Sequence, residues 1–159
     1  MKQWEIESVS VAFRRESDEE HKEPRFELPV PPGPNLVTER GLAQIEARVA
    51  SLEAFVAAGG EEQALADARR DLRYWRQRLA TAQLQPAPAG DAVGFGSTVT
   101  IRIDGRQRTL TIVGEDEADP AAALLALSAP LVRALLGGGE GDVLPFAGRD
   151  DAIEILMIG

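Results

Sequence analysis

Apolar residues recur every three or four positions after Val37, on both sides of Gly59-Gly60. They are Leu42, Ile45, Val49, Leu52 and Val56, then Leu65, Ala68, Leu72, Trp75, Leu79 and Ala82. This spacing is typical of a heptad seam. Two short heptad helices joined by a tight turn bury their seams against each other, and Thr38 suits the N-cap of the first helix. The pattern predicts an antiparallel helical hairpin, a short coiled coil, over residues 38–84.

Charged residues beside the seam predict its register. The positions that face one another in an antiparallel pair are Glu39, Glu46 and Glu53 on the first helix, and Arg69 and Arg76 on the second. We expect Glu53 to pair with Arg69 and Glu46 with Arg76. The chain then reverses near Glu62, which places "AAGGEEQ", residues 57–63, at the tip.

A different pattern follows the proline-rich linker at residues 85–92. "STVTIRID" and "RTLTIVG" alternate strictly and are joined through Asp104-Gly105, a hairpin signal, and "AIEILMI" is a last strand. Pro130 interrupts an intervening stretch of high helix propensity. We expect a short helix over residues 130–136, capped by Ser128 and stopped by Gly137. Residues 93–159 therefore form a domain of strands with a short helix.

The N-terminal segment, residues 1–37, is dense in charge and then in proline, which favours an extended, flexible segment. The alternation of Val9, Val11 and Phe13 is too short to predict a strand. His21 is the single histidine and lies in a charged run, where we expect no catalytic role.

Composition narrows the function. The net charge of -9 disfavours a protein that coats nucleic acid, and the absence of cysteine excludes zinc fingers, thiol catalysis and disulfides. The apolar stretches are too short for a membrane span, and no signal peptide is recognisable. We expect a cytoplasmic protein that is not an enzyme, with no catalytic residue, metal, cofactor or small-molecule substrate of its own.

Several motifs resemble a known family. "VGFGSTVTIRIDGRQRTLTIVGEDEAD" and "LSAPLVRALLGGGEGDVLPF" resemble the C-terminal domain of the bacterial GreA/GreB transcription elongation factors, and "LVTERGL" resembles the start of that family's helical hairpin. The resemblance covers residues 36–159. It implies an α+β fold, with the hairpin followed by an FKBP-like α+β domain that has an antiparallel sheet. It also makes "AALLAL" a strand and "GEDEAD", residues 114–119, a strand end rather than a calcium loop.

The resemblance implies a partner and binding residues. The C-terminal domain would dock on the rim of the secondary channel of RNA polymerase through Ser128, Pro130, Leu131 and Arg133. The hairpin would enter the channel, with Arg70 and Arg73 as its channel-facing basic residues and contact with nascent RNA at most indirect. In members that stimulate transcript cleavage, acidic residues at the hairpin tip help to hold a catalytic magnesium ion in the polymerase active site.

Two departures from the family decide the prediction. The acidic tip motif is missing, with only Glu61 and Glu62 near the reversal, and each helix of roughly 20 residues spans about 30 Å, which is short for the family. We therefore expect a short-armed, Rnk-like variant that binds RNA polymerase without stimulating cleavage. Two alternatives stay open: a cleavage factor in which Glu61 and Glu62 share the polymerase's magnesium ion, and a helical-hairpin adaptor unrelated to transcription.

Overall fold

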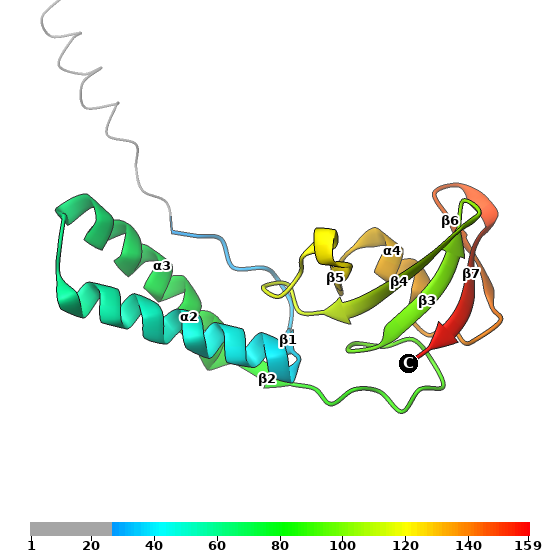
Figure 1. The fold of residues 1–159 in the computed structure, drawn as a ribbon, viewed down its shortest axis with the longest axis horizontal. Helices are drawn as coiled ribbons and strands as arrows, with labels where there is room; N and C mark the ends of the chain where they lie inside the picture. The colour runs from blue at the N-terminus through cyan, green and yellow to red at the C-terminus, as the bar shows by residue number, and fades with distance from the viewer. Residues whose placement is uncertain (1–26) are drawn as a thin grey trace, which may run out of the picture.

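The computed structural model describes residues 27–159, which form two parts joined at a junction (Figure 1). A helical hairpin, here called the arm, extends to one side, and a five-stranded sheet with a short helix forms a C-terminal domain on the other. The predicted N-terminal features at Val9, Val11, Phe13 and His21 lie outside the described residues. Between residues 27 and 159, no helix combines the length and apolar character needed to cross a membrane.

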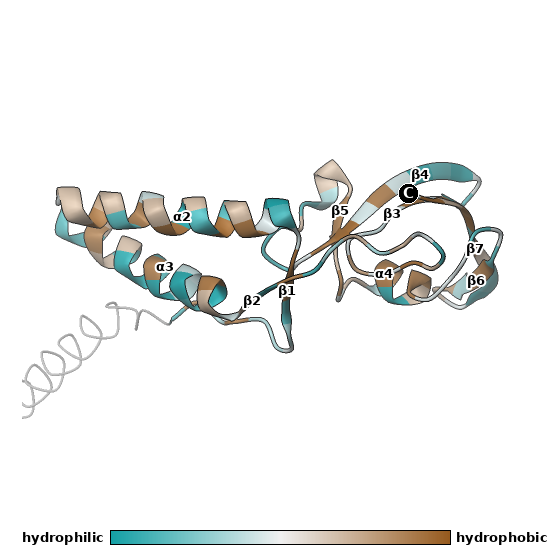
Figure 2. Cartoon of the chain, turned by 90° about the horizontal axis from the view of Figure 1, so that it is seen from below, coloured by the Kyte–Doolittle hydropathy of each residue, from teal (hydrophilic) through white to brown (hydrophobic). Residues whose placement is uncertain are grey.

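The arm consists of α2, Glu39–Ala58, and α3, Glu62–Thr81, each of 20 residues. Thr38 is the N-cap of α2, as predicted, because its side-chain oxygen accepts a hydrogen bond from the Gly41 backbone N–H at 3.0 Å. The two seams pack together, and Figure 2 shows the hydrophobic side of α2 turned toward α3. Their members are Val49, Leu52, Val56, Ala68, Leu72, Trp75 and Leu79. The predicted antiparallel hairpin is confirmed.

The predicted ion pairs across the arm are wrong by one heptad. Arg76 Nη2 lies 3.0 Å from the Glu53 carboxylate, where the charge pattern predicts pairs of Glu53 with Arg69 and of Glu46 with Arg76. The reason is that side chains tilt toward the N-terminus of their own helix. Glu53 leans toward the base of the arm and Arg76 leans toward its tip, so the two carry their charges toward each other. Directly opposed residues such as Glu53 and Arg69 lean apart.

A short parallel ribbon ties the two ends of the arm together. β1, Asn35–Val37, leads into α2, and β2, Ala82–Leu84, leaves α3, and the two pair over all three residues. The backbone N–H of Gln85 continues the ribbon by donating to the Val37 carbonyl at 3.0 Å. Residues 35–37, the last three of the predicted N-terminal segment, therefore form a strand that pairs at the base of the hairpin.

The C-terminal domain contains a sheet with the strand order β5-β4-β3-β7-β6. The strands are β3 Thr98–Ile103, β4 Arg106–Val113, β5 Leu124–Ala126, β6 Val143–Phe146 and β7 Arg149–Ile158. Neighbours are antiparallel except β4 and β5, which are parallel. Asp104 and Gly105, in the turn between β3 and β4, have φ of 53° and 73°, the positive values that a two-residue type I′ turn requires. The α+β class, a helical hairpin followed by a largely antiparallel sheet, is confirmed.

The helix α4, Pro130–Leu135, packs Val132 and Leu135 into the core of the sheet. It begins at the predicted proline, but the predicted Ser128 cap is wrong: the N-cap is Ala129, whose side chain makes no capping hydrogen bond. A residue before proline avoids the helical region, so Ala129 itself takes the extended cap conformation, with φ -60° and ψ 138°, and Ser128 lies one residue too early.

The stretch before α4 contains less strand than "AALLAL" predicts. A 3-10 turn, η1 Pro120–Ala122, comes first, and Ala123 has a left-handed conformation with φ 59°. Only Leu124–Ala126 then pairs with β4. This connection carries the chain from β4 back to its parallel neighbour β5, and it contains the loop at residues 114–119.

Candidate functional site

The junction between the arm and the C-terminal domain is centred on Arg78. This arginine lies in the last turn of α3 and is 2% exposed. Its Nε donates to Asp116 Oδ2 at 2.5 Å, and its Nη2 donates to Asn35 Oδ1 at 2.7 Å. A buried ion pair is tolerated only when the remaining donors also find acceptors. One guanidinium thus connects α3, β1 and the loop at residues 114–119.

Asn35 and Tyr74 complete this polar cluster. The Asn35 Nδ2 donates to the Arg78 carbonyl at 2.8 Å and to Thr81 Oγ1 at 3.2 Å. The Tyr74 hydroxyl donates to Asp116 Oδ1, so that both oxygens of this carboxylate are used. Burial, and next the hydrogen bond to Asp116, raise the pKa of Tyr74 to about 12. The cluster is therefore held as one arrangement of donors and acceptors.

A second contact lies at the start of α2. The Thr38 hydroxyl donates to Glu117 Oε1 at 2.5 Å while it caps the helix. Two glycines permit this approach: a Cβ on Gly41 would stand 2.7 Å from Glu117 Oε1, and a Cβ on Gly114 would stand 2.5 Å from the Leu36 carbonyl oxygen. The "LVTERGL" and "GEDEAD" segments are therefore two sides of one interface.

Two of the four carboxylates of "GEDEAD" contact the arm at this interface. Asp116 and Glu117 are 9% and 4% exposed at their side chains and both face residues of the arm. Across residues 27–159, no three histidine, aspartate or glutamate side chains are grouped so that they could hold a metal ion. The loop joins the two parts of the molecule.

A groove of about 300 Å³ lies beside the junction. Its walls include Pro32, Pro34 and Leu36 before the arm, and Phe95, Leu127 and Leu136 of the C-terminal domain. Among the predicted polymerase-binding residues, Ser128 and Arg133 are exposed and line this groove. Pro130 is exposed at the start of α4, whereas Leu131 is half-buried against the core.

The tip of the arm is a glycine turn followed by a helix cap. Gly59 and Gly60 have φ of 73° and 150°. Glu61 is the N-cap of α3: its two carboxylate oxygens accept the backbone N–H groups of Gln63 at 2.9 Å and Ala64 at 2.8 Å. Glu62 lies exposed in the first turn, where the helix dipole favours negative charge. The two predicted tip residues therefore differ, since only Glu62 has a carboxylate without a hydrogen bond to residues 27–159.

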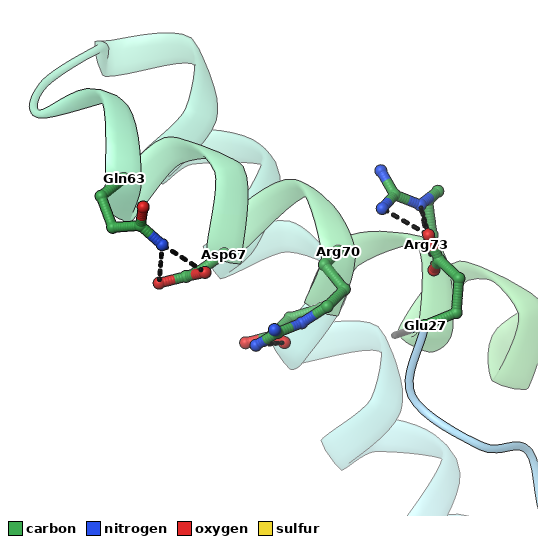
Figure 3. Close-up of polar contacts among 6 residues, drawn as sticks. Glu27, Gln63, Asp67, Arg70 and Arg73 are labelled. Carbon is green, nitrogen blue, oxygen red and sulfur yellow. Dashed lines mark hydrogen bonds and ion pairs between the residues drawn. The ribbon is translucent and has the colours of Figure 1, made fainter. Parts of the chain in front are cut away.

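A row of polar residues follows α3 from the tip toward its middle, as Figure 3 shows: Gln63, Asp67, Arg70 and Arg73. The Arg73 Nε and Nη2 donate to Glu27 at 2.9 and 2.6 Å. The hydrogen bond from Arg73 lowers the pKa of Glu27, and the same bond raises the pKa of Arg73. One of the two predicted channel-facing arginines thus holds the segment that precedes β1.

The other predicted channel-facing residue, Arg70, is only partly satisfied. Its Nη2 lies 3.6 Å from Asp71, and its Nε is buried without a hydrogen-bond partner among residues 27–159. Such a donor costs about 1–3 kcal/mol. Arg69, predicted to pair across the arm, is exposed and forms no ion pair within the described part of the chain. The arginines of α3 therefore include two with unused donors.

Comparison with known families identifies the C-terminal domain. The family described as "Transcription elongation factor, GreA/GreB, C-term" matches residues 87–159. This part of the chain is therefore similar to the C-terminal domain of the GreA/GreB family.

Curated GreA and GreB proteins match slightly more than half of the chain. Transcription elongation factor GreA of Desulfovibrio desulfuricans is 40% identical over 89 residues, which cover 54% of this chain and 54% of that protein. Transcription elongation factor GreB of Neisseria meningitidis serogroup B is 38% identical over 96 residues, covering 56% and 58%. The chain spans about half the length of the curated relatives it matches.

Among solved structures, the chain is similar to GreA factor homolog 1 (Gfh1) of Thermus thermophilus. The match covers 80% of this chain and 99% of that one, with 16% identity and a TM-score of 0.38.

Sequence reasoning missed the junction. The sequence pattern places Asn35 in an extended segment and Asp116 at a strand end, and it predicts no role for Arg78. A signal was present in the two glycines, Gly41 and Gly114, which stand in the two motifs that face each other and permit their close approach.

Proposed function

We propose that this protein binds RNA polymerase at its secondary channel and regulates elongation without stimulating transcript cleavage. Support for the partner comes from the C-terminal domain, which is similar to that of the GreA/GreB family and has relatives named transcription elongation factors. The exposed residues Ser128, Pro130 and Arg133 would contact the polymerase, and the arm would enter the channel.

The observation that carries the second half of the proposal is the state of Glu61. A carboxylate that holds a metal ion points its oxygens at that ion, whereas the two backbone N–H groups that Glu61 accepts turn its carboxylate toward the start of its own helix. Glu62 is then the one tip carboxylate that could face a metal ion. Glu61 cannot easily join it, because neighbouring side chains of a helix diverge by about 100°. A tip with one free carboxylate is a poor second ligand for the polymerase's magnesium ion.

The arm has a limited reach. Its helices of 20 residues each span about 30 Å at about 1.5 Å per residue. In the proposed mode the arm occupies the channel and competes with longer factors for the same entrance. No cofactor is required for this role, and any effect on nascent RNA is exerted through the polymerase.

Binding is tested by retention of core RNA polymerase on the immobilised full-length protein. We expect retention by the wild type and loss with Arg133→Glu. The matched control is Arg106→Glu, which makes the same charge change at another exposed arginine of the C-terminal domain. Equal retention by both variants would remove Arg133 from the contact, and no retention by the wild type would sink the proposal.

The absence of cleavage is tested on backtracked elongation complexes, with a cleavage-competent GreA as the positive control. We expect no shortening of the RNA at saturating protein, and reduced shortening when GreA competes with it. RNA shortened by the wild type but not by Glu61→Ala/Glu62→Ala would establish the cleavage-factor alternative instead. A stable dimer in sedimentation that does not retain polymerase would favour the adaptor alternative.

A further inference from the structure

The side of α3 that carries Arg69, Arg70 and Arg73, here called the arginine face, packs against no other helix of residues 27–159. We propose that this face is a docking surface for the chain's own acidic segment, residues 16–23. The proposal concerns a contact within one chain and is tested without polymerase, so its outcome is separate from that of the proposed function.

The first step is the path of the chain along α3. Asn35 is bound to Arg78 near the end of the helix, and Glu27 is bound to Arg73 nearer its middle. Followed toward the N-terminus, the chain thus moves along α3 in the direction of the tip. A chain that continued in this direction would next meet Arg70 and Arg69, which lie one turn farther along α3.

The second step is charge. Residues 16–23 read "ESDEEHKE", with five carboxylates against one lysine. On the arginine face, Arg69 forms no ion pair with any of residues 27–159, and the buried Nε of Arg70 has no acceptor among them. The carboxylate of Asp71 lies 3.6 Å from the Nη2 of Arg70. Carboxylates are the acceptors that match a guanidinium in charge and geometry.

The third step is reach. Four residues separate Glu27 from Glu23, and an extended chain of that length spans about 13 Å. Pro24 favours an extended conformation at Glu23. Four residues also separate Arg73 from Arg69, but along a helix they span only about 6 Å. The acidic segment is therefore long enough to cover the arginine face once Glu27 is held by Arg73.

The contact already observed sets the type of interaction. Arg73 binds Glu27 through two nitrogens, and the hydrogen bond between them lowers the pKa of Glu27. The remaining carboxylates would extend the same pairing up the helix. While docked, they exclude other anions, including nucleic-acid phosphates, from these arginines.

The test uses a nitroxide label on the full-length protein. The chain has no cysteine, so Ser17→Cys provides a single attachment site. We expect the label to broaden the side-chain N–H resonances of Arg69, Arg70 and Arg73 selectively, compared with those of Arg106 and Arg108 in the C-terminal domain. The selective broadening should be lost in about 1 M salt, where the screening length falls to about 3 Å. No broadening, or equal broadening of both sets, would overturn the proposal.

Matched variants separate docking from a general charge effect. Asp18→Asn/Glu19→Gln/Glu20→Gln should lose the selective broadening. Asp91→Asn/Asp150→Asn/Asp151→Asn, with the same change in net charge at exposed positions elsewhere, should keep it. Arg69→Glu/Arg73→Glu should lose the broadening at the remaining Arg70, and adding Asp18→Lys/Glu19→Lys/Glu20→Lys to that variant should restore it there. Docking on this face would be contradicted if the control variant Asp91→Asn/Asp150→Asn/Asp151→Asn lost the selective broadening. It would also be contradicted if the charge exchange failed to restore the broadening.

Discussion

The base and the tip of the arm are held in opposite ways. At the base, Arg78 and Asp116 are nearly inaccessible to solvent and are bonded across the boundary between arm and domain. At the tip, Glu61 is exposed, and among residues 27–159 its side chain bonds only to the backbone of its own helix. The base therefore fixes the direction in which the arm leaves the C-terminal domain. The tip only ends one helix and begins the next, so its residues can change with little effect on the rest of the molecule.

The largest expected effect comes from breaking the base. Asp116→Ala leaves the Arg78 guanidinium buried without its carboxylate, which should lower the free energy of unfolding by about 3–5 kcal/mol in chemical denaturation. Asp119→Ala is the matched control in the same loop, because Asp119 is exposed and its side chain makes no capping bond. We expect that control to lie within about 0.5 kcal/mol of the wild type. Similar losses in both variants would show that the ion pair does not stabilise the base.

The second prediction concerns the pKa of Tyr74 at the base of the arm. Tyr74 is the single tyrosine of the chain, so ultraviolet absorbance reports its ionisation alone. We expect a pKa of about 12, against the ordinary 10.0, because burial and the bond to Asp116 favour the neutral phenol. Since the folded-state pKa is raised, this stabilisation is fully present below pH 10 and is lost as the pH rises through 12.

Asp116→Asn sharpens that measurement. The substitution removes the negative charge and leaves most of the burial, so the Tyr74 pKa should fall below 12 without returning to 10.0. A wild-type midpoint at the ordinary value would mean that Tyr74 is not enclosed at the junction in solution.

Alanine substitutions at two glycines test how closely the chain is packed at the base and at the tip of the arm. Gly114→Ala would place a Cβ 2.5 Å from the Leu36 carbonyl oxygen, and a backbone atom cannot turn aside. We expect a loss of about 3 kcal/mol, at the upper end for overpacking. At the tip, a Cβ on Gly59 meets nothing within 4 Å, and only the φ of 73° opposes alanine, for a loss of about 1 kcal/mol. Thermal unfolding of the two variants should rank them in this order; the reverse order would argue against close contact at the base.

A smaller effect is expected from the helix cap at the tip. Glu61→Ala removes the acceptor of two backbone N–H groups, which should cost about 1 kcal/mol and speed hydrogen exchange at Gln63 and Ala64. Glu62→Ala removes the same charge but no cap, and should leave exchange at these two amides nearly unchanged. Equal exchange in both variants would show that Glu61 acts only through its charge.

The smallest effect lies midway along the arm. A double-mutant cycle on Glu53 and Arg76 should give a coupling of about 0.2–1 kcal/mol, as for other exposed ion pairs. The same cycle on Glu53 and Arg69 should give no coupling. A larger value for the second pair would restore the register that the charge pattern alone predicts.

Local signals in the sequence were sufficient for most elements. The cap at Thr38, the seams of α2 and α3, and the turn at Asp104-Gly105 each depend on residues close in the chain. The errors are also local. Ser128 was chosen as a cap by residue type, although Pro130 places the cap at the residue before it. β6, Val143–Phe146, was missed because its burial is partial and Pro145 makes it a poor strand by pattern.

The junction could not be predicted in the same way. The bond between Thr38 and Glu117 spans 79 positions, and that between Arg78 and Asp116 spans 38. These residues belong to no periodic hydrophobic pattern, and a single arginine or aspartate in a sequence is expected to lie on the surface. Their roles follow from the placement of the arm on the domain, which composition and spacing do not specify.

The ribbon of β1 and β2 has a consequence for how arms of different length can arise. It joins the points where the chain enters and leaves the hairpin, so the outer part of the arm, beyond the junction residues Gly41 and Tyr74, is an insert with fixed ends. Adding one heptad to each helix would advance the tip by about 10 Å. The buried cluster beneath would be unchanged. The number of heptads therefore sets the length of the arm, and this length can change without altering the junction that fixes the direction of the arm.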